Sequence, residues 1–103
     1  MLEKQVEARL KKRLGLEVPR AKCWKMVCPG ISGVPDRLIL LPGGQIVFVE
    51  LKQPGKHERV RQDYIHAVLR GMGFTVYSTV DSYARVEEVV ADIKRKAEMQ
   101  DGV

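Results

Sequence analysis

The sequence predicts a single α/β domain, with a mixed β-sheet flanked by helices and the element order α-β-β-β-α-β-α. Two patterns lead to this prediction. Apolar residues recur at helical spacing near both ends of the chain, and two apolar segments joined by a Pro-Gly-Gly turn lie between them. The length of 103 residues suits one hydrophobic core, so we expect one domain over residues 1–103.

The N-terminal third should form a helix and then a strand. Apolar residues recur every four positions over residues 2–14 and form one stripe, which is typical of an amphipathic helix. Gly15 and Pro19 should end this helix. Residues 21–28 suit a strand, and the Gly- and Pro-rich residues 29–35 should form a loop.

The best strand candidates are residues 36–41 and 45–52, which are rich in Leu, Ile and Val and flank the Pro-Gly-Gly turn of a hairpin. Both faces of this hairpin are apolar, so helices should cover both sides of the sheet. A helix over about 58–70, a strand over 74–79 and a last helix capped by Ser82 complete the order.

Composition and charge restrict the class of protein. The hydrophobic fraction is 45% and the charged fraction 30%, as in soluble globular proteins. No apolar run approaches the roughly 18 residues needed to cross a membrane, and the charged N-terminus does not resemble a signal peptide, so we expect a cytoplasmic protein. The net charge of +5 favours attraction to a polyanion, of which nucleic acid is the commonest.

The two cysteines, Cys23 and Cys28, are expected to be reduced thiols. Residues five apart on a strand point to opposite faces, which disfavours a disulfide between them. Two cysteines with no histidine nearby in sequence also fall short of a tetrahedral zinc site.

An acidic and a basic residue end the second strand of the hairpin. Glu50 and Lys52 lie on the same face as Ile46 and Phe48, because side chains alternate along a strand. Asp36 opens the preceding strand. A Glu-x-Lys at a strand end can be a solvated ion pair without any catalytic role, so the position of Asp36 matters.

The register of the hairpin decides whether the two acids meet. With a three-residue loop Leu41 pairs with Gln45, and Asp36 then lies opposite Glu50 with both carboxylates on one face. A two-residue loop would instead place Asp36 opposite Leu51, with the acids on different faces unless a bulge corrected the register.

Two neighbouring carboxylates repel each other unless a cation lies between them. Mg²⁺ or Mn²⁺ prefers such oxygen ligands, and the Leu51 carbonyl could supply another. Lys52 would then lie beside the metal, where it could orient or activate an attacking water and offset charge on a phosphate. The arrangement suits hydrolysis of a phosphodiester.

These motifs together resemble a known family. Gly33-Val34-Pro35-Asp36, the hairpin and Val49-Glu50-Leu51-Lys52 resemble the VRR-NUC group of the PD-(D/E)XK nuclease superfamily, in its short stand-alone phage and bacterial form. The match extends from the Glu-containing first helix through Gln62 to the segment Gly73-Phe74-Thr75-Val76-Tyr77, and it implies a restriction-endonuclease-like core.

The resemblance also implies residue roles. Asp36 and Glu50 would be metal ligands, Lys52 the catalytic lysine, and Gln62 a support for the site or for the substrate phosphate.

The family further tends to contribute a glutamate from the first helix, and Glu3 and Glu7 both fit. Glu3 is slightly preferred because it falls within the apolar stripe, where a carboxylate needs a partner such as a metal or a water held by a metal. Glu7 falls at the margin of the stripe.

Basic residues outside the motif are candidates for gripping the nucleic-acid backbone. They are Lys11, Lys12, Arg13, Arg20, Lys56, Arg59 and Arg61. We expect His57 and His66 to be solvated residues around an exposed helix. The aromatic residues Trp24, Tyr77 and Tyr83 are expected to pack rather than to stack on bases.

The sequence therefore predicts an Mg²⁺- or Mn²⁺-dependent DNA endonuclease of a bacterial or phage-infected cell. The resemblance implies a homodimer, and two sites facing branched DNA would suit resolution of Holliday junctions. Two alternatives stay open. One is a non-catalytic basic DNA-binding module, and the other is a nuclease subunit that acts on flaps or ends with a partner protein.

Overall fold

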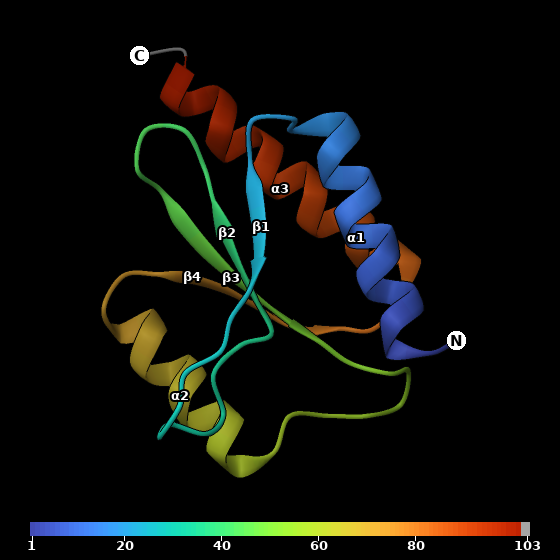
Figure 1. The fold of residues 1–103 in the computed structure, drawn as a ribbon, viewed down its shortest axis with the longest axis vertical. Coiled ribbons are helices and arrows are strands. Elements are labelled where there is room, and N and C mark those ends of the chain that lie inside the picture. Colours follow the sequence, from blue (N-terminus) through green and yellow to red (C-terminus); the bar gives the residue numbers. More distant parts are fainter. Residues whose placement is uncertain (102–103) are drawn as a thin grey trace.

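The computed structural model describes residues 1–101, and its elements follow the predicted order (Figure 1). The helices are α1 (Glu3–Glu17), α2 (Val60–Gly71) and α3 (Tyr83–Asp101). The strands are β1 (Lys22–Lys25), β2 (Arg37–Leu40), β3 (Ile46–Leu51) and β4 (Thr75–Val80). The α/β class and the element order predicted from the sequence are confirmed.

The four strands form one mixed sheet in the order β1-β2-β3-β4. β2 is antiparallel to both of its neighbours, β1 and β3. β3 and β4 are parallel and are joined by a crossover that contains α2. β3 is therefore an interior strand with both edges paired, as its near-continuous apolar sequence predicts.

Helices lie on both faces of the sheet. α1 and α3 pack together on one face, which we call the core face, and α2 lies on the other side beside β4 (Figure 1). Alternate residues of the strands, such as Ile39, Val47 and Val49, join α1 and α3 in one buried apolar cluster. The other sheet face, which we call the α2 face, is less completely covered.

The first helix is longer than predicted. It continues through Gly15, which has a helical rather than a left-handed backbone, and ends at Glu17. Val18 leaves the helix while its N–H still bonds to the Leu14 carbonyl, and Pro19 follows. A glycine inside a helix is tolerated when tertiary packing compensates, and here Leu14 and Val18 are both buried in the core.

The hairpin has the three-residue loop. The Leu41 N–H donates to the Gln45 carbonyl over 2.9 Å, and Arg37 pairs with Val49 further along. Gly43 and Gly44 both have a positive φ, which explains the Gly-Gly sequence at this turn. Continuing the same register sets Asp36 opposite Glu50, as predicted for a loop of three residues.

A β-bulge in β4 lies opposite Glu50. Val49 pairs with Tyr77 but Leu51 pairs with Val80, so two β4 residues face one β3 residue. Thr79 adopts φ +53°, which is unusual for a β-branched residue. The bulge returns the Val80 side chain to the core face, where it is fully buried.

Candidate active site

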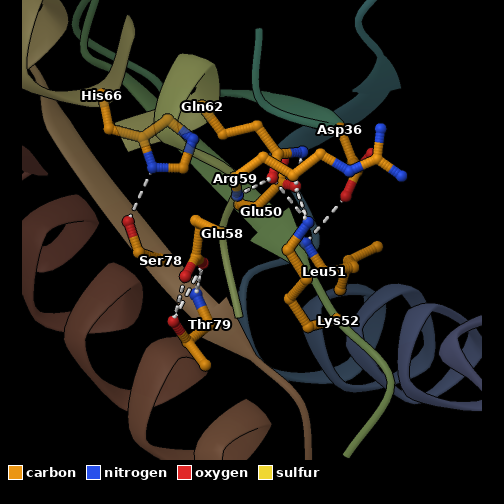
Figure 2. Close-up of polar contacts among 10 residues, drawn as sticks. All are labelled: Asp36, Glu50, Leu51, Lys52, Glu58, Arg59, Gln62, His66, Ser78 and Thr79. Atoms are coloured by element: carbon orange, nitrogen blue, oxygen red, sulfur yellow. Dashed lines mark hydrogen bonds and ion pairs between the residues drawn. The ribbon is translucent and has the colours of Figure 1, made fainter. Parts of the chain in front are cut away.

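Glu50 is the centre of a polar cluster on the α2 face of the sheet. Its side chain is only 1% exposed. Figure 2 shows its Oε2 accepting two hydrogen bonds, from Lys52 Nζ at 2.6 Å and from Gln62 Nε2 at 2.8 Å. The other oxygen, Oε1, is buried and has no hydrogen-bond partner among the residues that the structure describes.

Asp36 lies on the neighbouring strand end and contacts the same segment. Its Oδ2 accepts the Leu51 N–H over 2.8 Å (Figure 2). This bond continues the hairpin beyond the last backbone pair, because a side-chain oxygen takes the place of a strand carbonyl. It fixes Asp36 against the segment that carries Glu50 and Lys52.

Gln62 is oriented by the start of α2. Its Oε1 accepts the Arg59 N–H at 2.8 Å, as a capping residue in the first turn does, and also accepts Lys52 Nζ at 3.0 Å. Both partners are donors, so this atom must be the oxygen, and the amide nitrogen faces Glu50. The first turn of α2 therefore holds Lys52 Nζ between two fixed acceptors, Gln62 Oε1 and Glu50 Oε2.

The electrostatics of Glu50 follow from its position. Burial raises its pKa to about 7, and the nearby Asp36 carboxylate acts in the same direction, while the hydrogen bond from Lys52 opposes both. A buried carboxylate with one unpaired oxygen and a second carboxylate nearby favours the arrival of a cation.

The two glutamates of α1 lie in different surroundings. Glu3 lines an open pocket of about 290 Å³ that also contains Lys52. Burial raises the pKa of Glu3, and the Asp36 carboxylate adds to that effect. Glu7 instead accepts a hydrogen bond from Arg37 Nε over 3.0 Å, and Arg37 Nη2 lies 3.0 Å from the same Oε2 as an ion pair. The structure thus brings Glu3, the preferred candidate, to the predicted site.

Sequence reasoning missed Arg37 as the partner that engages Glu7. Its side chain is 11% exposed and lies on the core face, between α1 and β2. The Glu7 hydrogen bond raises the pKa of Arg37 further. The alternation of side chains along a strand could have revealed this contact, because it puts Arg37 on the same face as the fully buried Ile39. A guanidinium on that face needs a buried partner.

The predicted basic residues divide into three groups. Lys56 and Arg59 line the pocket that contains Lys52. Arg61 donates to the Ser32 carbonyl at 3.2 Å and lies over the Tyr64 ring, so it joins α2 to the loop before β2.

The remaining basic residues lie on α1 or just after it, away from Lys52; they are Lys11, Lys12, Arg13 and Arg20. Lys11 is about 12 Å along the helix from Glu3, at the usual rise per residue. Arg13 bonds to Glu87 of α3 at 2.9 Å and thereby joins the two helices.

Two predictions about single residues were wrong. His66 is 1% exposed and not solvated, because it lies under α2, where its Nδ1 shares a hydrogen bond with Ser78 Oγ at 2.8 Å. Trp24 does not pack in the core, because it is 56% exposed on the edge strand β1. The expectation that Tyr77 packs is confirmed, and both cysteines are free thiols as predicted.

Glu58 is a second residue that the sequence did not single out. Its carboxylate accepts both the N–H and the hydroxyl of Thr79, at 2.5 and 2.6 Å for the shortest contacts (Figure 2). These bonds hold the bulge of β4 to the segment between β3 and α2. No local pattern marks this contact, since it joins residues 21 apart in sequence.

Comparisons with known proteins agree with this fold. A solved VRR_NUC domain superposes with a TM-score of 0.76 and 29% sequence identity, covering 86% of this chain and 94% of that domain. A protein named "Putative nuclease p44", from Acyrthosiphon pisum secondary endosymbiont phage 1, is 49% identical over 53 residues. That match spans 52% of this chain and 57% of the phage protein.

No protein-family model matches the chain. The resemblance to the VRR-NUC group, predicted from the sequence, is nevertheless confirmed by the structural likeness, and the chain has the restriction-endonuclease-like α/β fold. Within residues 1–101 no helix is long and apolar enough to cross a membrane.

Proposed function

We propose that this chain is a metal-dependent DNA endonuclease that hydrolyses phosphodiester bonds. The observation that carries the proposal is the convergence of Asp36, Glu50, Lys52 and Gln62 on one sheet face, with Lys52 Nζ held between Glu50 and Gln62. A basic net charge of +5 and the likeness to a VRR_NUC domain support a nucleic-acid substrate.

The residues present fit a hard divalent cation. Within the described chain no three acidic, histidine or cysteine side chains gather into a complete metal cage. Mg²⁺ does not need one, because it is commonly held by one or two carboxylates, with waters and substrate phosphate completing the shell. The unpaired Glu50 Oε1 and the Asp36 carboxylate supply such ligands.

The Leu51 carbonyl is a third candidate ligand. A strand residue points its N–H and its C=O to the same side, and the Leu51 N–H points to Asp36. When bound at these oxygens, Mg²⁺ or Mn²⁺ lowers the pKa of a water and offsets charge on the phosphate.

The protein side chains orient the reaction. Lys52 is a cation whose position is fixed by two acceptors, so it can hold an attacking water or a phosphate oxygen without first becoming ordered. Gln62 keeps that lysine in place and keeps one Glu50 oxygen occupied, which leaves the other for the metal. Glu3, across the pocket, supplies a further carboxylate near Lys52.

Lys56 and Arg59 would bind substrate phosphates beside the scissile one. Both line the pocket around Lys52, and phosphate contacts of this kind position a strand without reading its sequence. Lys11 and Lys12 on α1, and Arg20 just after it, could contact DNA only at a distance from this pocket.

The finer proposal is a homodimer that acts on branched DNA such as a Holliday junction. One chain supplies one small site, and symmetric cutting of two strands needs two. The outward side of α2 offers a surface for the second copy, because Val60, Tyr64, Val68 and Met72 recur every four residues there and are all exposed. Tyr64→Lys should then convert a dimer to a monomer in light scattering, and Leu16→Lys should not.

The test is cleavage of labelled four-way junctions, flaps and single strands, with Mg²⁺, with Mn²⁺ and with EDTA. We expect the wild type to cut only with metal, and Lys52→Ala to bind the same DNA without cutting. If the wild type binds DNA but cuts none of these substrates with either metal, the chain is a binding module and the proposal fails. Preference for flaps or ends would replace the junction proposal and leave the chemistry intact.

A further inference from the structure

We propose that Trp24 is a stacking platform for an unpaired nucleobase next to the Asp36–Glu50 pair. This inference rests on the proposed function and deepens it, because it makes a strand with an unstacked base the ligand that the protein prefers. It concerns binding and not cleavage, so the two proposals can fail separately.

The first argument is the exposure of the side chain. Trp24 is the only tryptophan of the chain and is 56% exposed on a regular strand. Tryptophan is a large apolar side chain, and leaving more than half of it in water forgoes much of the stability that burial would give. The exposed indole ring is therefore available to a ligand.

The second argument is the face of the sheet. Trp24 pairs with Leu38, and Leu38 pairs with Phe48, so all three lie on the α2 face. Leu38 is only partly buried, whereas its neighbour Ile39 on the core face is fully buried. The α2 face is therefore only partly covered at Leu38, beside the exposed Trp24 ring.

The third argument is the distance to the acids. Asp36 lies two residues before Leu38, on the same face as Trp24, and its carbonyl accepts the Met26 N–H. A diagonal neighbour across two antiparallel strands is about 7–8 Å away between backbones. A nucleotide adjacent to one held at Asp36 can therefore lay its base on the Trp24 ring.

The chemistry favours a nucleobase over an apolar protein surface. Lys22 lies two residues before Trp24 on the same face of β1 and is exposed, so a partner on the ring meets a cation beside it. A single strand offers a phosphate to this lysine and a π-face to the indole. A continuous duplex does not, because each base face is already covered by its neighbours. Only a gap, flap or opened branch frees a base.

The tryptophan itself reports the contact. We would titrate the wild-type protein with a single-stranded oligonucleotide in EDTA, following Trp24 fluorescence for stacking and the anisotropy of a labelled strand for binding. Two matched ligands are needed: the same strand with abasic sites in place of its bases, and a covalently closed duplex circle. Trp24→Phe, Trp24→Ala and Leu16→Ala complete the set, the last as an exposed apolar residue of α1 outside the sheet.

We expect the single strand to quench the emission strongly, and the abasic strand and the closed duplex to leave it nearly unchanged. Trp24→Ala should weaken single-strand binding about 5- to 140-fold, since stacking of one base is worth about 1–3 kcal/mol and 1.4 kcal/mol corresponds to tenfold. Trp24→Phe should retain most of the affinity, and Leu16→Ala should match the wild type.

Several results would overturn the inference. One is binding by anisotropy without quenching, or equal quenching by the abasic strand. Another is a blue-shifted emission that DNA does not change, which would mean that a second copy of the chain covers Trp24. Absence of any DNA binding would also overturn it. If cleavage persists while quenching is absent, the nuclease proposal survives and the stacking role does not.

Discussion

The contact between Glu7 and Arg37 gives the sharpest test of how the two α1 glutamates differ. Glu7→Gln removes a carboxylate whose Oε2 accepts a hydrogen bond from Arg37 Nε and forms an ion pair with Arg37 Nη2, each over 3.0 Å. The Arg37 side chain is 11% exposed and that of Glu7 is 32% exposed. The substitution therefore leaves a nearly buried cation without its counter-charge.

The size of the effect follows from this burial. Removing one partner of a fully buried pair costs about 3–5 kcal/mol, and an exposed pair is worth about 0–1 kcal/mol. With one partner buried and the other partly exposed, we expect Glu7→Gln to lower the free energy of unfolding by about 2–3 kcal/mol. For a chain of this size that corresponds to a fall in Tm of about 8–24 °C. Arg37→Met should cost less, because Glu7 can turn toward water.

The assay is urea unfolding at neutral pH, with Glu7→Gln, Arg37→Met, the double variant and Glu3→Gln. The two single changes should be non-additive, with the double variant close to Arg37→Met. Glu3→Gln should leave stability in EDTA within about 0.5 kcal/mol of the wild type, as an exposed substitution does. Added Mn²⁺ should raise the free energy of unfolding of Glu7→Gln by as much as that of the wild type, and that of Glu3→Gln by less. If Glu7→Gln is as stable as the wild type, or loses its response to Mn²⁺, the reasoning is wrong.

Three further predictions concern activity, pH and backbone. Lys52→Ala should lower metal-dependent cleavage about 10²–10⁴-fold with little change in DNA affinity, which single-turnover rates and anisotropy would show, and unchanged cleavage would refute its role. Burial lowers the pKa of His66, so the folded state favours neutral imidazole. Stability should be full above the ordinary pKa of about 6.5 and fall as the pH drops through it, and His66→Gln should flatten that slope in urea titrations at pH 8 to 5. Gly33→Ala should destabilise more than Gly30→Ala, because both have a positive φ but only Gly33 would place a Cβ 2.9 Å from Arg61. Equal losses in Tm would contradict that contact.

Much of the fold followed from the sequence because its signals are local. The Pro-Gly-Gly turn favoured a short hairpin loop, and the alternation of side chains then placed Asp36 opposite Glu50 once that loop had three residues. Ser82 caps α3 as expected, with its Oγ accepting the Arg85 N–H. The end of α1 did not follow from local sequence, because the packing of Leu14 and Val18 extends the helix past Gly15.

The contacts that support the site could not be predicted, because they join distant segments. Nothing near Glu58 in sequence indicates that it binds Thr79, and nothing near His66 indicates that α2 would turn it toward Ser78. The exposure of Trp24 depends on how little of the sheet α2 covers, which is a property of packing and not of β1 itself. The sequence also does not show which α1 glutamate is bound away from the site. The contact between Arg37 and Glu7, which joins two distant segments, decides this.

The bulge in β4 limits how the length of this chain can change. Because Ser78 and Thr79 together face one β3 residue, removing either would turn Val80 away from the core and bring a polar side chain in. Loop residues 53–57 carry no such constraint on side-chain alternation. Among related proteins we therefore expect insertions and deletions to accumulate between β3 and α2, while the number of residues between Tyr77 and Val80 stays constant.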